Sequence, residues 1–321
     1  MVELKNTFAE LALEALGTKC HIIFADFTNS AISEATDLVK SQLERYDLIF
    51  SVHRSDSEAT RVNIASSSTM AVSDEFALLV SLYKEKYVAS DHKIDLTAGF
   101  DLLDLYRRFN PLVEEACNKD FFRRIDFSDV SVVLASDDSS AQLSRPVGAF
   151  LDFGGLGKAF IADRIASTLV ASFSGGVLVN LGGDISTAGV VPYGGWNVKV
   201  TDDFSLDTAA SGGSVRIFGG GIATSSIVTR TWDDSSGSKR LHIVGEGLKK
   251  SSIATVTAVG LSAFEANYYS LASLLMGDNA VPFLIKSRVP SLVRSLDGRG
   301  LAVSGWPMKS EDSENNLIGV N

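Results

Sequence analysis

Apolar residues recur three and four positions apart along several stretches of the chain, the spacing that brings them to one face of a helix. The clearest stretch is residues 31–50, with apolar side chains at positions 31, 35, 38, 39, 43, 46 and 49. The same spacing predicts further helices at residues 73–84, 100–109, 158–171, 262–277 and 281–286. We therefore expect helices at intervals along the whole chain.

Short aliphatic and β-branched runs between these helices predict strands. Such runs are residues 21–25, 131–135, 147–153, 176–180 and 196–200, with a polar turn at 137–140. Residues 201–221 are rich in Asp, Ser and Gly and are expected to hold two short strands, and residues 233–239 form a polar turn between strands. The polar, charged tail at 308–321 is expected to be disordered.

The order of these elements indicates the fold class. Helices are interspersed with strand pairs and do not alternate with single strands, which favours an α+β fold over a parallel α/β fold. We find no internal repeat, no low-complexity linker and no sharp change in composition. A single domain over residues 1–307 is therefore predicted.

Composition excludes several classes of partner. The 321 residues are 45% hydrophobic and 21% charged with a net charge of −10, which argues against a nucleic-acid partner. No apolar run approaches the ~18 residues of a membrane span. The only N-terminal run that could act as an export signal is interrupted by Glu3, Glu10 and Glu14. The chain has two cysteines, Cys20 and Cys117, which in a chain of this size are more often buried thiols than a disulfide. As the sequence stands, we expect a cytoplasmic protein.

Two Gly-Gly pairs are the strongest chemical signal. Residues 151–158 read Leu-Asp-Phe-Gly-Gly-Leu-Gly-Lys, and residues 180–184 read Asn-Leu-Gly-Gly-Asp. Glycine permits positive φ angles and close approach of a ligand to the backbone. A lysine at a helix start adds a cation beside free N–H groups. Either pair alone is more often an ordinary turn, but together with Asp152, Lys158 and Asp184 they favour a phosphate site.

These segments resemble the central signature of the ApbE family, the FAD:protein FMN transferases, which reads D-x-G-G-x-A-K-G, then A-x-D-R, then N-x-G-G-D. Further family landmarks follow in the same order: Leu16-Gly17-Thr18, residues 51–63, Asp95-Leu96-Thr97-Ala98-Gly99, Trp196 and Ala223-Thr224-Ser225. The resemblance runs from about residue 16 to residue 305. It implies an ApbE-like (T-fold-like) domain of mixed and antiparallel sheets with flanking helices.

The resemblance also implies a reaction: the FMN half of FAD moves to a threonine or serine hydroxyl of an acceptor flavoprotein, and AMP is released. The two glycine turns would cradle the diphosphate through their backbone N–H groups. The implied FAD-binding residues are Thr97, Ala98, Gly99, Asp152, Gly154, Gly155, Lys158, Gly182, Gly183, Asp184 and Thr224.

His242 stands where the family carries a histidine, which makes it the candidate general base for the acceptor hydroxyl. The alternative is a histidine with a purely structural place in a strand. By resemblance, Mg²⁺ would be held by the carbonyl of Gly157 and by a helix reading A-D-x-x-x-T. In this chain the Asp position holds Asn267 and the Thr position holds Leu271, so a weakened or altered Mg²⁺ site is expected.

Three functions stay open at this point. The first is FMN transfer to an acceptor protein. The second is a FAD-binding relative that has lost transfer through its altered metal site. The third is a FAD diphosphatase, in which water replaces the acceptor hydroxyl.

Overall fold

The computed structural model describes residues 6–134, 140–200, 214–228, 231–233, 237–249, 251–306 and 317–320. Its contacts divide the chain into two compact units, each built from separate segments. The sheet unit comprises Met1–Gln42, Lys158–Arg230 and Gly245–Asn321, and the helical unit comprises Leu43–Gly157 and Thr231–Val244. Two of the boundaries between the units fall within helices, at residues 42–43 and 157–158. The single domain predicted from the sequence stays a prediction.

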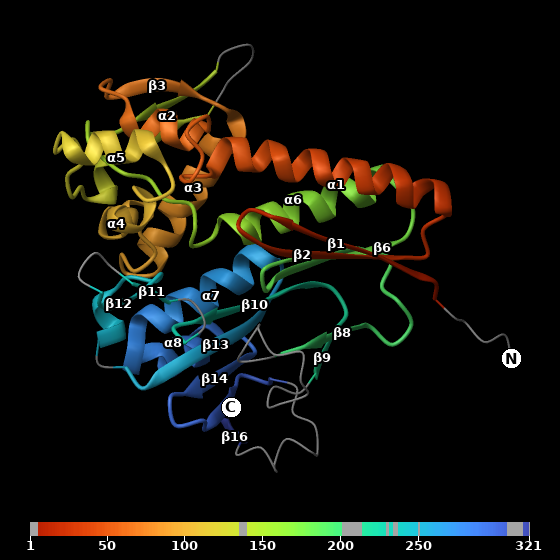
Figure 1. The fold of residues 1–321 in the computed structure, drawn as a ribbon. Coiled ribbons are helices and arrows are strands. Elements are labelled where there is room, and N and C mark those ends of the chain that lie inside the picture. The colour runs from red at the N-terminus through yellow and green to blue at the C-terminus, as the bar shows by residue number, and fades with distance from the viewer. Residues whose placement is uncertain are drawn as a thin grey trace, which may run out of the picture. The chain divides into compact units, whose positions relative to one another are not determined.

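A nine-stranded sheet organises the sheet unit, in the order β1-β2-β6-β7-β10-β13-β14-β15-β16 (Figure 1). Neighbouring strands are antiparallel except for the parallel pair β15–β16, so the sheet is mixed and the predicted α+β class is confirmed. The strands are β1 (Phe8–Ala15), β2 (Thr18–Ala25), β6 (Gly176–Leu181), β7 (Asp184–Gly189), β10 (Gly220–Ser226), β13 (Ile253–Gly260), β14 (Ser291–Ser295), β15 (Gly300–Val303) and β16 (Leu317–Val320).

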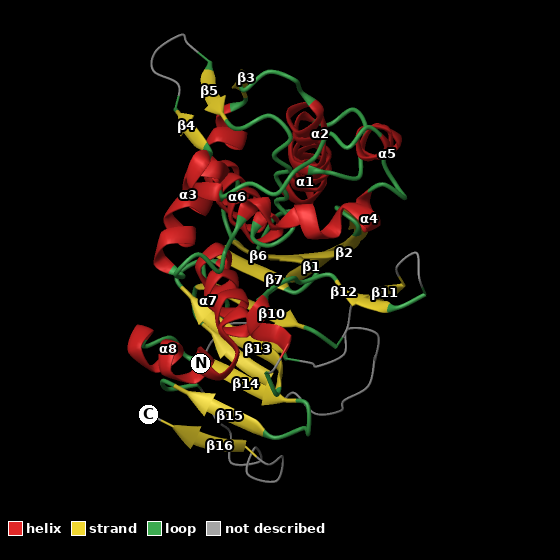
Figure 2. Cartoon of the chain, turned by 90° about the vertical axis from the view of Figure 1, so that its left-hand side faces the viewer, coloured by secondary structure: helices red, strands yellow, loops and turns green. Residues whose placement is uncertain are grey.

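Helices cover one face of this sheet and a small hairpin covers the other. On the first face lie α6 (Gly157–Ser172) and α7 (Ala263–Met276), followed by α8 (Ala280–Ser287) (Figure 2). On the second face, β8 (Trp196–Lys199) and β9 (Ser214–Ile217) bury an apolar cluster that includes Ile185 of β7. Because side chains alternate along a strand, Asp184 and Ser186 point to the face that carries the helices.

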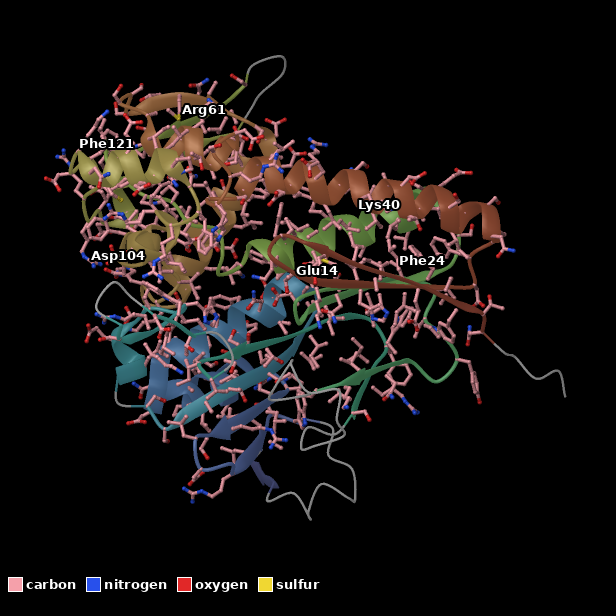
Figure 3. All side chains as sticks on the ribbon, in the orientation of Figure 1. Glu14, Phe24, Lys40, Arg61, Asp104 and Phe121 are labelled. Carbon is pink, nitrogen blue, oxygen red and sulfur yellow. The ribbon has the colours of Figure 1, made fainter. Side chains whose placement is uncertain are left out.

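The helical unit combines short helices with two small antiparallel sheets. The C-terminal part of α1 (Asn29–Phe50) runs into it, and Ala35 and Val39 of this helix are buried while Lys40 is exposed (Figure 3). Its other elements are α2 (Glu58–Ile64), α3 (Asp74–Ala89), α4 (Leu103–Tyr106), α5 (Pro111–Asn118), the 3-10 turns η1 (Leu96–Leu102) and η2 (Phe127–Asp129), the sheet β3 (Thr69–Val72), β5 (Ala141–Ser144) and β4 (Ser131–Val133), and the hairpin β11 (Thr231–Asp233) and β12 (Lys239–Leu241).

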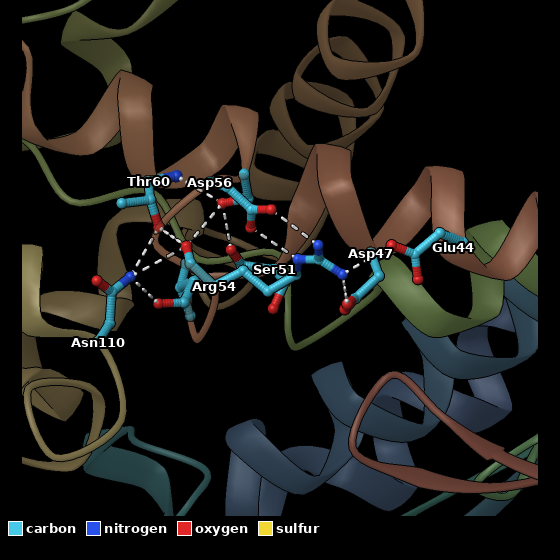
Figure 4. A network of polar contacts seen from close by, with 9 residues as sticks. Glu44, Asp47, Ser51, Arg54, Asp56, Thr60 and Asn110 are labelled. Carbon is cyan, nitrogen blue, oxygen red and sulfur yellow. Dashed lines mark hydrogen bonds and ion pairs between the residues drawn. The ribbon is translucent and has the colours of Figure 1, made fainter.

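A polar network fixes the loop in front of α2. The Arg54 guanidinium binds the carboxylates of Asp56, Asp47 and Glu44 at 2.9–3.0 Å (Figure 4). These partners raise the pKa of Arg54 above its ordinary value. The Asn110 amide donates to the backbone oxygens of Val52 and Arg54 in this loop and to the Thr60 hydroxyl in α2. The network therefore fixes the start of α2, the helix that carries Asn63.

Most predicted elements are confirmed. The helices expected at 31–50, 73–84, 158–171, 262–277 and 281–286 coincide with α1, α3, α6, α7 and α8. The strands expected at 21–25, 131–135, 176–180 and 196–200 coincide with β2, β4, β6 and β8. Periodicity found these elements because each has one buried face.

Three predictions are wrong in part. Residues 147–153 form no strand, and residues 100–109 are divided between the 3-10 turn η1 and the single helical turn α4. Of the tail at 308–321, which was expected to be disordered, residues 317–320 form β16 against β15. Residues 137–139, 201–213 and 234–236 lie outside the described residues; they include parts of the predicted turns and most of the segment 201–221, in which two strands were expected. Within that segment, β9 forms at Ser214–Ile217.

Within the described part of the chain, no helix combines the length and the apolar character that a membrane crossing requires.

Candidate functional site

The first glycine loop, residues 151–157, is held at both ends by buried side chains of the helical unit. The Asn63 amide donates to the Leu151 carbonyl at 2.9 Å and its oxygen accepts the Leu151 N–H at 2.8 Å. The Tyr83 hydroxyl accepts the Leu156 N–H at 2.7 Å and donates to the Phe153 carbonyl at 3.1 Å. These contacts replace a strand ladder, which is why an apolar run forms an irregular segment here.

Asp152 is the centre of this loop. Its Oδ1 accepts the Gly154 N–H at 2.8 Å, and its Oδ2 accepts the Tyr106 hydroxyl at 2.6 Å. Its own N–H donates to the Leu96 carbonyl at 2.9 Å. A Cβ on Gly99 would lie 2.4 Å from the Asp152 Cβ, so only glycine permits this approach. The structure therefore brings together Asp152, Gly154 and Gly99, which the sequence predicts as site residues.

His53 is a residue of this region to which sequence reasoning assigned no role. Its ring meets the rings of Tyr106 and Phe109 edge-on, at centroid distances of 5.2 and 5.6 Å. Desolvation by the surrounding protein lowers the pKa of His53, and the Asp152 and Asp47 carboxylates oppose that shift only in part. His53 is therefore neutral near pH 7. No spacing in the sequence could have indicated its neighbours, which come from distant segments.

The backbone N–H and the hydroxyl of Thr97 both have partners within the helical unit. Its N–H and its hydroxyl both lie 2.7 Å from Asp95 Oδ1, and the hydroxyl also lies 3.0 Å from the Ile125 carbonyl oxygen. Burial raises the pKa of Asp95, although the bonds from Thr97 act the other way. Thr97 is buried and Ala98 is half-buried. Their predicted contact with FAD stays a prediction.

The second glycine pair forms the tight turn between β6 and β7 in the sheet unit. Gly182 and Gly183 have φ angles of +69° and +102°, the positive values that a two-residue hairpin turn demands. The Gly182 N–H donates to the Lys19 carbonyl at 3.1 Å, and the Gly183 N–H donates to Asn180 Oδ1 at 2.8 Å. A Cβ on Gly182 would lie 2.4 Å from Thr18 Oγ1, so two predicted motifs pack directly together.

These contacts correct one expectation about the glycines. We expected their N–H groups to cradle a diphosphate, yet those of Gly154, Gly182 and Gly183 donate to Asp152, Lys19 and Asn180. Gly154 is also not in the left-handed region, and its place is explained by the Asp152 carboxylate 3.1 Å from where a Cβ would be. A phosphate would have to contact these turns through other atoms or displace these bonds. That the turns bind FAD stays a prediction.

Helix α6 starts at the end of the first glycine loop. The Gly157 N–H donates to the Phe153 carbonyl at 2.8 Å, and Lys158 follows as a half-buried residue of the first turn. The charge of Lys158 acts on the buried Cys20 thiol, whose pKa is nonetheless raised by burial. Asp184, the first residue of β7, is also buried. A lysine and an aspartate thus stand at the starts of two elements of the sheet unit.

Two neighbouring residues of β10 each pair a hydroxyl with a hydroxyl of another element. Thr224 Oγ1 lies 2.9 Å from Thr257 Oγ1 of β13, and Ser225 Oγ lies 2.8 Å from Ser270 Oγ of α7. Thr224, a predicted FAD-binding residue, is half-buried and keeps this cross-strand partner.

The donor set expected for Mg²⁺ does not fit that ion. Asn267 is a buried residue of α7 that offers one neutral amide oxygen, and Leu271 offers none. The Gly157 carbonyl belongs to the first turn of α6, where it accepts a helical hydrogen bond. Among the described residues, no cluster of three or more His, Cys, Asp or Glu side chains has the arrangement of a metal site. Mg²⁺ prefers several hard, anionic oxygen ligands, which these residues do not supply.

His242 follows the last residue of β12 and lies in a bend, so the strand predicted for it ends one residue earlier. The Arg108 guanidinium lies over the Trp232 ring at 5.1 Å, and the Trp232 ring N–H donates to the Leu241 carbonyl at 3.4 Å. The hairpin that carries His242 is therefore fastened to the residues that follow α4. The role of His242 as a base stays a prediction.

The fold and these motifs define an α+β protein with a mixed sheet, helices on one of its faces, and glycine turns before α6 and between β6 and β7. Residues 16–293, which are most of the chain, match the ApbE family. The chain belongs to the ApbE family.

Known relatives agree with this assignment. The chain is 26% identical over 203 residues to the FAD:protein FMN transferase of Klebsiella pneumoniae, covering 62% of this chain and 61% of that protein. It is 26% identical over 204 residues to the enzyme of the same name from Treponema pallidum, covering 58% and 56%. The crystal structure of the ApbE protein of Thermotoga maritima has the same fold, with a TM-score of 0.73, 20% identity, and coverage of 94% and 98%. The match thus spans about three fifths of the two transferases.

Gly182→Ala should destabilise the protein more than Gly194→Ala. Both glycines have positive φ angles, +69° and +85°, which cost a side chain roughly 1–2 kcal/mol, but only Gly182 also has a neighbour in the way of a Cβ. We expect the free energy of unfolding from urea denaturation to fall by about 1 kcal/mol or more beyond the Gly194→Ala loss. Equal losses in the two variants would contradict the packing of Thr18 on Gly182.

The pKa of His53, measured by NMR titration, should lie below the ordinary value of about 6.5. Asp152→Asn should lower it further, because the Asp152 carboxylate raises it. As the pH falls below about 6.5, the unfolded chain takes up this proton before the folded one, so His53 makes the fold less stable toward acid. Asp104→Asn, an exposed carboxylate of α4, serves as the control and should leave the titration unchanged. A higher pKa in Asp152→Asn would refute the assignment.

Proposed function

We propose that this protein transfers the FMN half of FAD to a threonine or serine hydroxyl of an acceptor flavoprotein. The observation that carries the proposal is the match to the ApbE family over residues 16–293. The hydroxyl oxygen bonds to the FMN phosphorus while the bond from that phosphorus to the bridging oxygen breaks. AMP leaves with the bridging oxygen, and the hydroxyl proton passes to a base.

The residues of this chain suit separate parts of that task. Lys158, at the start of α6, supplies positive charge toward a diphosphate, and the positive end of the helix dipole adds to it. Asp184 and Asp152 are hydrogen-bond acceptors for the sugar or ring groups of FAD. His242 takes the proton of the acceptor hydroxyl as general base.

A second function is favoured by one observation, the replacement of the expected metal ligands by Asn267 and Leu271. A protein that keeps the flavin pocket without these ligands would bind FAD and transfer nothing. The two functions differ in one measurable product, a flavin that stays on another protein after denaturation.

Co-expression with an acceptor domain for covalent FMN should yield an acceptor band on a denaturing gel that fluoresces under flavin excitation. His242→Ala should weaken this band about 100-fold or more, because general base catalysis contributes on that order. His92→Ala is the control, since His92 is an exposed histidine stacked on Tyr87. An unlabelled acceptor beside a protein that retains FAD would support binding alone, and AMP release without labelling would indicate FAD hydrolysis.

The double variant Asn267→Asp/Leu271→Thr should gain Mg²⁺ affinity, because it adds a charge and a hydroxyl one turn apart on α7. Titration calorimetry with MgCl₂ and FAD-loaded protein measures the gain independently of transfer. Asn267→Asp/Leu274→Thr is the matched control, because Leu274 is also buried in the same helix but lies about two turns, or about 10.5 Å, from Asn267, too far for one ion to contact both. Equal Mg²⁺ affinity in the double variant and the control would contradict the assigned register.

A further inference from the structure

One carboxylate of the sheet unit joins three elements that are far apart in the sequence. Asp163 Oδ1 of α6 accepts the Ser186 hydroxyl of β7 at 2.6 Å and the Ala263 N–H of α7 at 2.9 Å. Its Oδ2 accepts the Phe264 N–H at 2.9 Å. The first N–H groups of a helix have no partner inside the helix, so Asp163 completes the start of α7 from outside it.

The sheet below offers α7 no side chain to rest against at this point. Gly221 of β10 and Gly260 of β13 are paired across the strands. A Cβ on Gly221 would lie 2.3 Å from the Ala263 nitrogen, and one on Gly260 would lie 2.7 Å from the Ala266 nitrogen. Two glycines thus let the backbone of α7 sit directly on the sheet. Bonds to other elements then fix its sideways position: those to Asp163 at its start and the Ser225–Ser270 pair farther along.

The predicted site residues of this unit lie close, along the same helices and strand, to the residues that form these bonds. Asn267 follows Ala263 by one helical turn on the same face of α7. Asp184 precedes Ser186 by two residues and shares its face of β7, about 7 Å along the strand. Lys158 precedes Asp163 in α6 by about 7.5 Å along the helix axis. Any shift among the three elements would therefore move these residues relative to one another.

We infer that Asp163 is a positioning residue of the flavin site, holding α6, β7 and α7 in the register that FAD binding requires. The inference rests on the proposed function, since it assigns the register to FAD. A charged carboxylate suits this place because it accepts all three bonds, and its negative charge lies at the positive end of α7. An amide at the same place would keep one accepting oxygen and turn its N–H₂ group toward another donor.

The test measures FAD affinity by flavin fluorescence, well below the unfolding temperature, for Asp163→Asn and Ser186→Ala. We expect Asp163→Asn to raise the Kd for FAD about 10-fold or more and Ser186→Ala to raise it roughly 2- to 5-fold. The double variant should be no weaker than Asp163→Asn within about 2-fold, because Ser186 acts through the same carboxylate. Asp163→Glu, which restores the charge, should recover part of the affinity.

Ser262→Ala is the matched control. Ser262 caps the same helix by accepting the Glu265 N–H at 3.2 Å, but these bonds do not reach α6 or β7. Its loss should lower the unfolding temperature and leave the Kd for FAD within about 2-fold of the unaltered protein. Should Asp163→Asn fail to fold, Ser186→Ala alone still decides the question.

Two results would overturn the inference, and they are distinguishable. If Asp163→Asn and Ser186→Ala bind FAD like the unaltered protein while only the unfolding temperature falls, Asp163 is a stability residue. If the unaltered protein itself binds no FAD, the proposed function is wrong, and with it the assignment of Asp163 to FAD binding.

Discussion

Every buried backbone N–H and C=O group needs a hydrogen-bond partner, and this requirement shapes the motifs of this protein. Where the chain leaves its sheets, a few side chains provide those partners. Asn63 supplies both bonds of Leu151, Asn180 holds the Gly183 N–H, and Asp163 closes the start of α7. The glycine loops keep their shape because of these bonds, and the residues beside them are placed accordingly.

The same bonds explain what the sequence reveals and what it hides. Amphipathic helices such as α1 and α7 are visible because one face of each packs inward, and buried strands such as β6 are visible as apolar runs. Strand β1 went unpredicted although it alternates, because its outward Glu10 and Glu14 were read only as evidence against an export signal. Residues 147–153 have the composition of a strand but bond to side chains instead.

The candidate site was likewise predictable from the sequence only in part. The motif resemblance singled out Asp152, Lys158 and Asp184; the structure has Lys158 in the first turn of α6, Asp184 as the first residue of β7 and Asp152 just before the first glycine pair. It could not show that Asp152 and Asn180 would occupy the glycine N–H groups, because that depends on side-chain rotamers. It also gave no role to Asp163, His53 or Tyr106, whose partners come from segments distant in the chain.

We propose that the glycine motifs of this chain form a flavin site although Asn267 and Leu271 stand where metal ligands were expected. Hydrogen–deuterium exchange with and without FAD tests it most directly, because exchange reports protection segment by segment. We expect saturable protection in residues 97–99, 152–158 and 180–186. No change on adding FAD, or protection confined to other segments, would contradict it.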